Sequence, residues 1–170
     1  YKTTLECALF EENIPTSVYH NLLQTVKDNL SPLVDYLELR KQALGVKSLH
    51  AYDLFTPLID TRPKPRKYEE AVKDTIEALA PLGDEYTRIL EEGLLRKRWV
   101  DRYENKGKRS GAFSWGCYRC PPYMLLNYKD ELEDSVFTLV HEAGHSMHSY
   151  FSDLAQPFRY SHYTIFVAEV

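Results

Sequence analysis

The chain has 170 residues, of which 44% are apolar and 27% are charged, and its formal net charge is −4. This size and composition indicate one globular domain with a buried core. The negative charge argues against a general nucleic-acid binder, and no apolar run is long enough to span a membrane. We expect both ends to be cuts through a longer protein, because the sequence starts without Met and ends without a polar tail.

The first part of the chain predicts helices. From residue 16 onward, apolar residues recur at three- and four-residue spacings. Ser31 and Pro32 interrupt this pattern as an N-cap followed by proline, so one helix should end before this pair and another should begin there. The second helix is expected to run to Leu44, with Gly45 as its stop.

A proline-rich loop and two more helices should follow. The segment 62–67 carries prolines and basic residues, which predicts a loop. The next helix is expected to run from 68 to Gly83. Asp84 then caps a helix that is predicted to continue through 85–99. The charged faces of these helices are expected to be solvated.

The character of the sequence changes at Val100. The segment 100–128 is rich in glycine, aromatic and small polar residues. It predicts a turn at 105–107 and one or two short strands around 112–118. A basic stretch over 96–109 raises the alternative of nucleic-acid binding, but acidic residues interrupt it and the whole chain is negative. A solvated turn is therefore favoured.

A long helix is predicted near the end of the chain. Asp130 should cap it, Glu133 follows three residues later as in a capping box, and the pattern continues to about Ser152. At about 100° per residue, one stripe of this helix is apolar and forms its core face. That stripe comprises Leu132, Val136, Leu139, Val140, Ala143 and Met147.

A second stripe of this helix carries histidines. His141 and His145 are one turn apart in a His-Glu-x-x-His motif, so both imidazoles can reach one ion. Glu142 lies beside that line, where its carboxylate can take a proton from water that attacks a peptide carbonyl. The spacing therefore predicts two zinc ligands and one general base. The alternative is a helix with two surface histidines and a surface glutamate.

A zinc site needs a third protein ligand. The metzincin pattern would place glycine at 148 and histidine at 151, but the chain has His148 and Phe151, which excludes that pattern. Asp153 lies too far along the same helix. His162 and Glu169 can both return alongside the helix, and Glu169 is favoured. It is the only charge in the run "IFVAEV", where an uncompensated carboxylate would be costly to bury. That run alone predicts either strand or helix.

The cysteines are expected to be free thiols. Cys7, Cys117 and Cys120 are an odd number, and the last two are close together, which suits a reducing compartment such as the cytoplasm. A second zinc site or a redox site would need partners that the sequence does not identify.

The chain resembles the oligoendopeptidase F family of zinc metallopeptidases, relatives of thimet oligopeptidase. The resemblance covers almost all of the sequence rather than one motif. It is carried by "ALFEENIP", "LELRKQALG", "LHAYDLFTPL", "RWVDRYENKGKRSGAFSWG", "PPYMLLNYKD", "FTLVHEAGHSMHSYF" and "IFVAEV".

This resemblance implies roles for particular residues. His141, His145 and Glu169 would bind one zinc ion, and Glu142 would be the general base and general acid. The implied fold is mainly α, a zincin-type catalytic domain with a small β-sheet next to the active-site helix. Its cleft would admit short unstructured peptides, and the segment 111–114 is similar to the sheet edge along which substrate would pair. The groups that steady the oxyanion in the family would lie beyond the end of the chain, so no tyrosine is assigned that role.

We therefore predict a partial catalytic domain, residues 1–170, of a longer peptidase. It would comprise a helical part over 1–99, short strands and loops over 100–128, and zinc-binding helices over 129–170. The predicted function is zinc-dependent cleavage of short oligopeptides in the cytoplasm, without nucleic-acid or membrane partners. The alternative is a non-catalytic helical binding module with a structural zinc site. Glu142 argues against that alternative, because a structural site needs no base.

Overall fold

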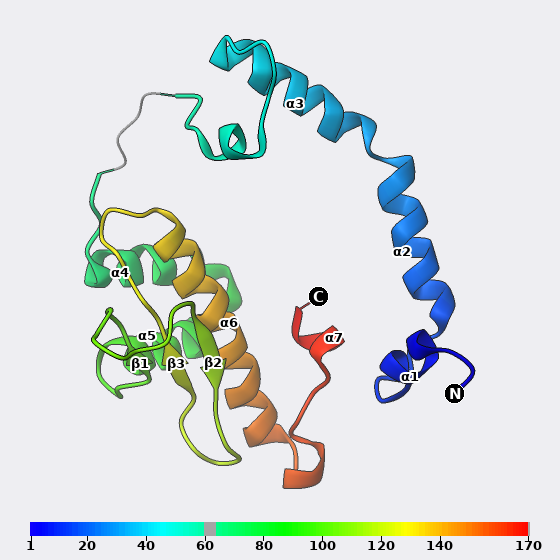
Figure 1. Ribbon diagram of the computed structural model, residues 1–170. Coiled ribbons are helices and arrows are strands. Elements are labelled where there is room, and N and C mark those ends of the chain that lie inside the picture. Colours follow the sequence, from blue (N-terminus) through cyan, green and yellow to red (C-terminus); the bar gives the residue numbers. More distant parts are fainter. Residues whose placement is uncertain (60–63, 170) are drawn as a thin grey trace. The chain divides into compact units, whose positions relative to one another are not determined.

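The computed structural model describes residues 1–59 and 64–169, and its contacts divide the chain into two compact units (Figure 1). The first unit holds residues 1–59 and the second holds residues 64–169. The described residues form seven α-helices and one three-stranded sheet, so the expectation of a mainly α fold with a small sheet is confirmed. No helix among them is long and apolar enough to cross a lipid bilayer.

The described residues of the first unit form helices and connecting loops, without a strand. The helices are α1 (Thr4–Phe10), α2 (Thr16–Asp28), α3 (Ser31–Leu44) and the short 3-10 helix η1 (Ala51–Phe55). The predicted break before Ser31 is confirmed, although Ser31 is the first helical residue rather than the cap. Gly45 ends α3 as predicted, because its φ of 65° is easy for glycine and its N–H bonds back to the carbonyl of Gln42.

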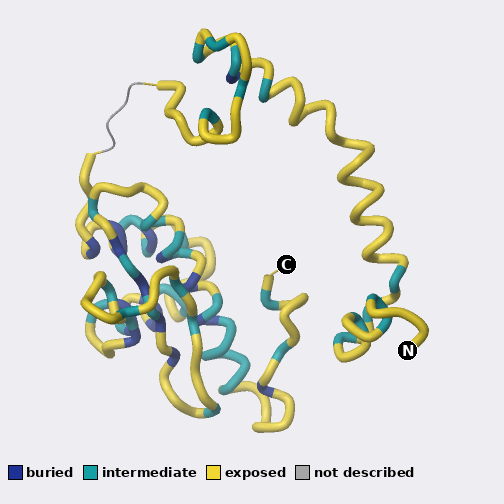
Figure 2. Tube along the Cα trace, viewed as in Figure 1, coloured by how far each residue is buried: buried dark blue, intermediate teal, exposed yellow. Residues whose placement is uncertain are grey.

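Most residues of the first unit are exposed to solvent, as Figure 2 shows, and they include many of its large apolar residues. No described residue of α2 is buried, and the one buried residue of α3 is Arg40. The Arg40 guanidinium donates to the carbonyls of Asp53 and Thr56, with N···O distances of 2.8 and 2.6 Å. These bonds fasten η1 and the residue after it to α3, so a polar contact organises this end of the unit.

The second unit contains the sheet and the remaining helices. They are α4 (Tyr68–Ala78), η2 (Ala80–Leu82), α5 (Asp84–Leu95), β1 (Val100–Asp101), β2 (Phe113–Trp115), β3 (Tyr123–Leu125), α6 (Asp134–Ala155), η3 (Phe158–Tyr160) and α7 (Ile165–Glu169). The strand order is β1-β3-β2, with β1 parallel and β2 antiparallel to the central β3. Helix α6 contacts β2, β3 and α5, so the sheet lies beside the helix that carries the histidine motif (Figure 1).

Three predicted helix boundaries are wrong. Helix α4 ends at Ala78 instead of Gly83, since a proline at 81 has no N–H and disfavours the helical conformation before it. Helix α5 ends at Leu95 instead of 99, where the chain turns through Arg98 at a φ of 56°. Helix α6 begins at Asp134 rather than after Asp130, whose carbonyl accepts instead from the Arg66 N–H at 2.7 Å. Of the predicted loop 62–67, residues 62 and 63 lie outside the described residues.

The core of the second unit is formed by buried residues of α4, α5, β3 and α6 and of the segments next to β1 and β3 (Figure 2). Three of the predicted stripe residues, Leu139, Ala143 and Met147, are fully buried or nearly so. Leu132 is 51% exposed and precedes the helix, so its assignment to the core is wrong. The full set of buried apolar residues is Tyr68, Ala71, Val72, Ile89, Leu90, Leu94, Trp99, Met124, Leu126, Tyr128, Leu139, Ala143 and Met147.

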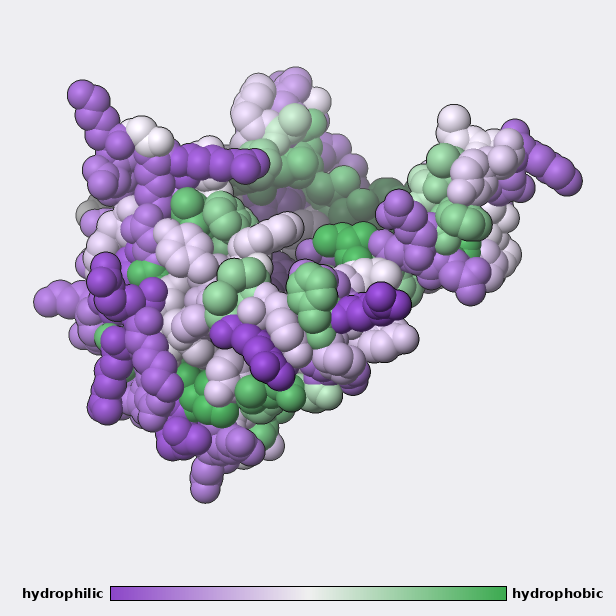
Figure 3. Space-filling model, turned by 90° about the horizontal axis from the view of Figure 1, so that it is seen from below, coloured by the Kyte–Doolittle hydropathy of each residue, from purple (hydrophilic) through white to green (hydrophobic). Residues whose placement is uncertain are grey.

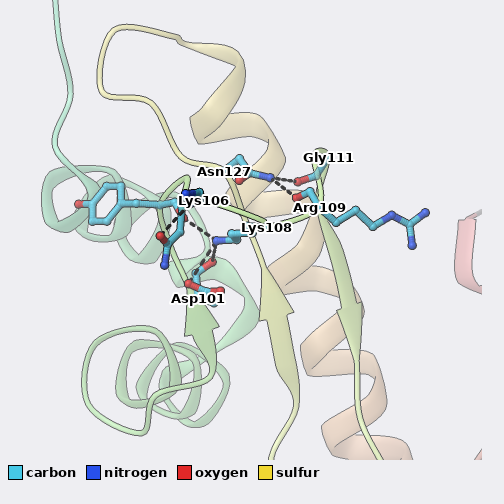
Figure 4. Close-up of polar contacts among 8 residues, drawn as sticks. Asp101, Lys106, Lys108, Arg109, Gly111 and Asn127 are labelled. Carbon is cyan, nitrogen blue, oxygen red and sulfur yellow. Dashed lines mark hydrogen bonds and ion pairs between the residues drawn. The ribbon is translucent and has the colours of Figure 1, made fainter.

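The long loop between β1 and β2 is held by two polar side chains (Figure 4). The Lys108 amine donates to the carbonyls of Asp101 and Tyr103, at 3.1 and 2.7 Å, and pairs with the Asp101 carboxylate. The Asn127 amide donates to the carbonyls of Arg109 and Gly111, at 3.0 and 2.8 Å. These contacts fix the loop to β1 and to the chain after β3, and so determine where β2 begins.

Candidate metal centre

The side chains of His141 and His145 project from α6 and lie next to each other. Their Nε2 atoms are 3.0 Å apart, and their rings lie edge to face with centroids 4.6 Å apart. Glu169, at the end of α7, brings its carboxylate to the same place, 3.9 Å from His141 Nε2 and 3.7 Å from His145 Nε2. The structure therefore brings together the three residues that the sequence proposed as ligands. All their ligand atoms lie within 4.8 Å of one another.

The segment that returns to α6 is fastened by hydroxyl groups. Ser152 Oγ donates to the Ser161 carbonyl at 2.6 Å, and the Tyr163 hydroxyl lies 2.7 Å from Ser149 Oγ. The Tyr163 ring also stacks on His148 with centroids 3.6 Å apart. These serines and His148 lie on the histidine side of α6, so the same stripe that carries the motif also fixes the chain that delivers Glu169.

Glu142 is more buried than His141, His145 or Glu169, with 7% of its surface exposed. Its carboxylate accepts a hydrogen bond from the backbone N–H of Ser114 on β2. Burial raises the pKa of this carboxyl, which the positive fields of His141 and His145 oppose. A carboxylate with a raised pKa accepts a proton more readily at neutral pH, which is the property that a general base requires.

A pair of serines holds strand β2 against α6. The Ser114 and Ser146 hydroxyl oxygens are 2.8 Å apart, and Ser146 is fully buried one turn after Glu142. This contact therefore holds β2 against α6 one helical turn from the Glu142 carboxylate. The sequence placed the segment 111–114 at a sheet edge but did not identify the Ser114–Ser146 contact. A serine in the middle of an otherwise apolar helix face was the available signal.

A cavity of about 600 Å³ lies between β2, α6 and the chain around α7. His141, Glu142, His145 and Glu169 form part of its wall, as does the edge strand β2. His162, the other candidate third ligand, also lines the cavity but does not belong to the metal-competent group found among the described residues. A second cavity of about 760 Å³, beside Trp99 and the end of α6, lies away from this group.

The donor set fits a zinc ion. Zinc in proteins favours imidazole and carboxylate donors in tetrahedral geometry, with bonds of about 2.0–2.1 Å that place ligand atoms about 3.3 Å apart. The distances of 3.0, 3.7 and 3.9 Å between the three donor groups bracket that spacing. Three donor residues beside a cavity would also leave a fourth position open on a bound ion, as in catalytic rather than structural zinc sites.

The basic stretch before β2 faces inward or is paired at several of its positions. Lys97 pairs with Glu92 at 2.8 Å. Arg102 pairs with Glu69 at 2.8 Å and lies 4.1 Å over the Tyr68 ring. The Lys108 side chain is almost fully buried and pairs with Asp101. Three of the seven basic residues of this stretch are therefore paired with carboxylates of the second unit.

Comparison with known proteins gives matches over the whole chain. The model of peptidase family M3 matches residues 1–170. The chain is 51% identical to an oligoendopeptidase F homolog of Borreliella burgdorferi and 49% identical to oligopeptidase PepF of Bacillus subtilis, over its whole length in both cases. It covers only 29% and 25% of the length of these relatives.

A solved structure supports the same relationship. The crystal structure of a putative peptidase from Chlamydophila abortus superposes with a TM-score of 0.83 at 46% identity, covering 100% of this chain and 28% of that one. The family model matches the full chain, and the structure superposes closely on that of a relative at 46% identity, so the chain belongs to peptidase family M3.

Proposed function

We propose that the chain is part of the catalytic domain of a zinc-dependent endopeptidase that hydrolyses short peptides. The observation that carries this proposal is the convergence of His141, His145 and Glu169 within 4.8 Å, beside a buried glutamate on the wall of one cavity. The relatives named as oligoendopeptidase F and oligopeptidase support peptides as the substrate class.

The side chains have distinct roles in this proposal. His141, His145 and Glu169 would hold the ion, which when bound supplies a Lewis acid and lowers the pKa of water toward neutrality. Glu142, held by the Ser114 N–H, would take the proton of the attacking water and deliver it to the leaving amine. Strand β2 is at the edge of the described sheet, so an extended peptide could pair with it and lie across the cavity.

The free cysteines favour the cytoplasm as the compartment. Cys7, Cys117 and Cys120 are all unpaired in the structure. Structural disulfides are rare in reducing compartments, where thiols of this kind persist.

Substituting Glu142→Gln in the complete protein tests the role of the base. The amide keeps the size of the side chain but cannot accept a proton, so kcat on a quenched fluorescent peptide should fall by roughly 10²–10⁴ while zinc content stays the same. Glu131→Gln, at an exposed residue just before α6, is the matched control and should keep full activity. A Glu142→Gln enzyme that retains zinc and cleaves at the wild-type rate would leave the non-catalytic zinc module as the better explanation.

Substituting Glu169→Ala tests the third ligand. Loss of a partner that only orients a ligand typically costs about 10–100-fold in metal affinity, so removal of a direct ligand should weaken zinc binding at least that much. His162→Ala is the control, because His162 lines the same cavity outside the donor group. Zinc affinity is measured by competition with a chelator. Equal affinities for Glu169→Ala and wild type would remove Glu169 from the site.

A further inference from the structure

The loop between β2 and β3 carries two cysteines at its turn. The Cys120 N–H donates to the Cys117 carbonyl at 2.8 Å, and Arg119 between them has a φ of 60°. A four-residue turn of this kind brings its first and fourth Cα atoms within about 7 Å of each other. Disulfides form between Cα atoms about 4.4–6.8 Å apart, so the turn places the two cysteines within bonding reach.

Tyr118, the first of the two residues between the cysteines, fastens this turn to the chain at the end of α6. The Tyr118 hydroxyl donates to the Gln156 carbonyl at 3.1 Å, and its ring packs edge-on against Phe158 with centroids 5.4 Å apart. The Arg119 guanidinium lies 5.3 Å from the centre of the same ring. Tyr118 therefore joins this turn to the segment that follows α6.

Both cysteines are free and exposed to solvent. The neighbouring Cys120 side chain raises the pKa of the Cys117 thiol, and the negative charge of Asp153 acts in the same direction. Figure 3 views the molecule from the side where this loop and the end of α6 lie, and shows hydrophobic residues interspersed with hydrophilic ones on that face.

The pair also lies on the wall of the candidate active-site cavity. Cys117 and Cys120 line the same 600 Å³ space as His141 and Glu142. They do not belong to a metal-competent group of three donors among the described residues, since the group found there is His141, His145 and Glu169. Two adjacent thiols without a third ligand suit thiol–disulfide chemistry better than a metal.

We propose that Cys117 and Cys120 form a reversible dithiol–disulfide site on the wall of the cavity, oxidised by small-molecule disulfides such as oxidised glutathione. In the first step one cysteine thiolate attacks the glutathione disulfide, which gives a protein–glutathione mixed disulfide and releases one glutathione thiolate. In the second step the other cysteine attacks the mixed disulfide and releases the second glutathione. The protein loses two protons and two electrons, and the glutathione disulfide is reduced to two thiols.

The second cysteine has a consequence for the cavity. A glutathionyl group is a peptide in size and composition, and on either cysteine it would occupy space beside the proposed ligands. The internal disulfide adds no atoms and frees that space. The pair would therefore clear adducts from the cavity, which is a role that a single cysteine cannot perform.

The test treats the complete protein with oxidised glutathione, alkylates the remaining thiols and maps the peptide that holds residues 117–120. Wild type should give a peptide lighter by two hydrogen atoms, and dithiothreitol should restore both thiols. Cys117→Ser and Cys120→Ser should each stop at the glutathione adduct. Cys7→Ser, at an exposed cysteine of α1, is the control and should leave the wild-type product unchanged.

Three outcomes would overturn the proposal. In the first, wild-type protein keeps a stable glutathione adduct on either cysteine. In the second, both thiols stay free in a redox buffer that oxidises an unstructured Cys-x-x-Cys peptide, and in the third, they react only after a chelator has removed a metal from them. Peptide cleavage is a second readout and rests on the proposed function. Under oxidant, wild type should keep its activity and each single-cysteine variant should lose most of it. Because peptide mapping needs no activity, failure of the peptidase assignment would not affect the first readout.

Discussion

Helix α2 in the first unit and helix α6 in the second both carry apolar side chains at helical spacing, yet these differ greatly in exposure. On α2, Leu22 is 61% exposed and Val26 is 53% exposed. On α6, Leu139 and Ala143 are fully buried. Helix α6 contacts β2, β3 and α5, whereas α2 contacts α1. Apolar spacing therefore predicts that a segment is a helix, and the elements packed against it decide whether its apolar face is buried.

The polar contacts of the two units differ in the same way. In the first unit, Arg40 fastens η1 to α3 through backbone carbonyls. In the second, Ser114 and Ser146 join a strand to a helix that is already packed on a core. A hydrogen bond between packed elements limits the movement of the side chains beside it. The candidate site of the second unit has this kind of support.

Replacing one leucine in each unit should give the largest difference between them. Leu139→Ala removes a fully buried side chain and should lower the free energy of unfolding by about 2–5 kcal/mol. Leu22→Ala removes an exposed side chain and should change it by less than about 0.5 kcal/mol. Urea denaturation of the 170-residue chain, followed by tryptophan fluorescence, reports on the second unit, which holds Trp99 and Trp115.

A comparable loss for Leu22→Ala would contradict this comparison. It would mean that the stripe on α2 is buried in solution and contributes to the stability that the tryptophans report. Amide hydrogen exchange gives an independent check. The backbone amides of α6 should be protected by global stability, and those of α2 should exchange through local opening.

Replacing Gly93 or Gly144 with alanine should have opposite effects on stability, because the first glycine is closely packed and the second is not. A Cβ on Gly93 would lie 2.2 Å from Trp99 Cε3, so Gly93→Ala should force the indole to move and destabilise the second unit by about 1–3 kcal/mol. No described atom lies within 4 Å of a Cβ placed on Gly144 in α6. Gly144→Ala should therefore stabilise the helix by about 0.5–1 kcal/mol. Thermal unfolding of both variants measures the two signs, and destabilisation by both would show that the space beside Gly144 is filled.

The main features of the site could be predicted because its chemistry depends on spacing. One helical turn separates His141 from His145, and the lone carboxylate in an apolar run identified Glu169. Their geometric convergence agrees with that prediction, while their roles as ligands stay a prediction. The resemblance to a peptidase family, which the comparisons confirm, came from long matching segments rather than from the motif alone.

The contacts that position those residues could not be read from local patterns. The Ser114–Ser146 bond joins residues far apart in the chain, and the Tyr163–His148 stack depends on how the chain turns after α6. The missed strands β1 and β3 are only two and three residues long, too short for an alternating pattern to identify. The wrong start of α6 has a similar cause, because Asp130 makes a tertiary bond to Arg66 that competes with capping.

High pH should also give a difference between the two units. Burial raises the pKa of Tyr128 to about 12 from 10.0, and it raises that of Tyr68 as well. The neutral phenols are favoured in the folded state, so the stability they contribute is complete below a pH of about 10 and is lost as the pH rises through about 12. Urea denaturation across this interval should show the second unit weakening. Tyr128→Phe should reduce that pH dependence, although it removes the 2.8 Å bond to the Arg66 carbonyl. Tyr52→Phe, at a 71% exposed residue of the first unit, should follow the wild-type curve, and an equal change in both variants would show that burial is not the cause.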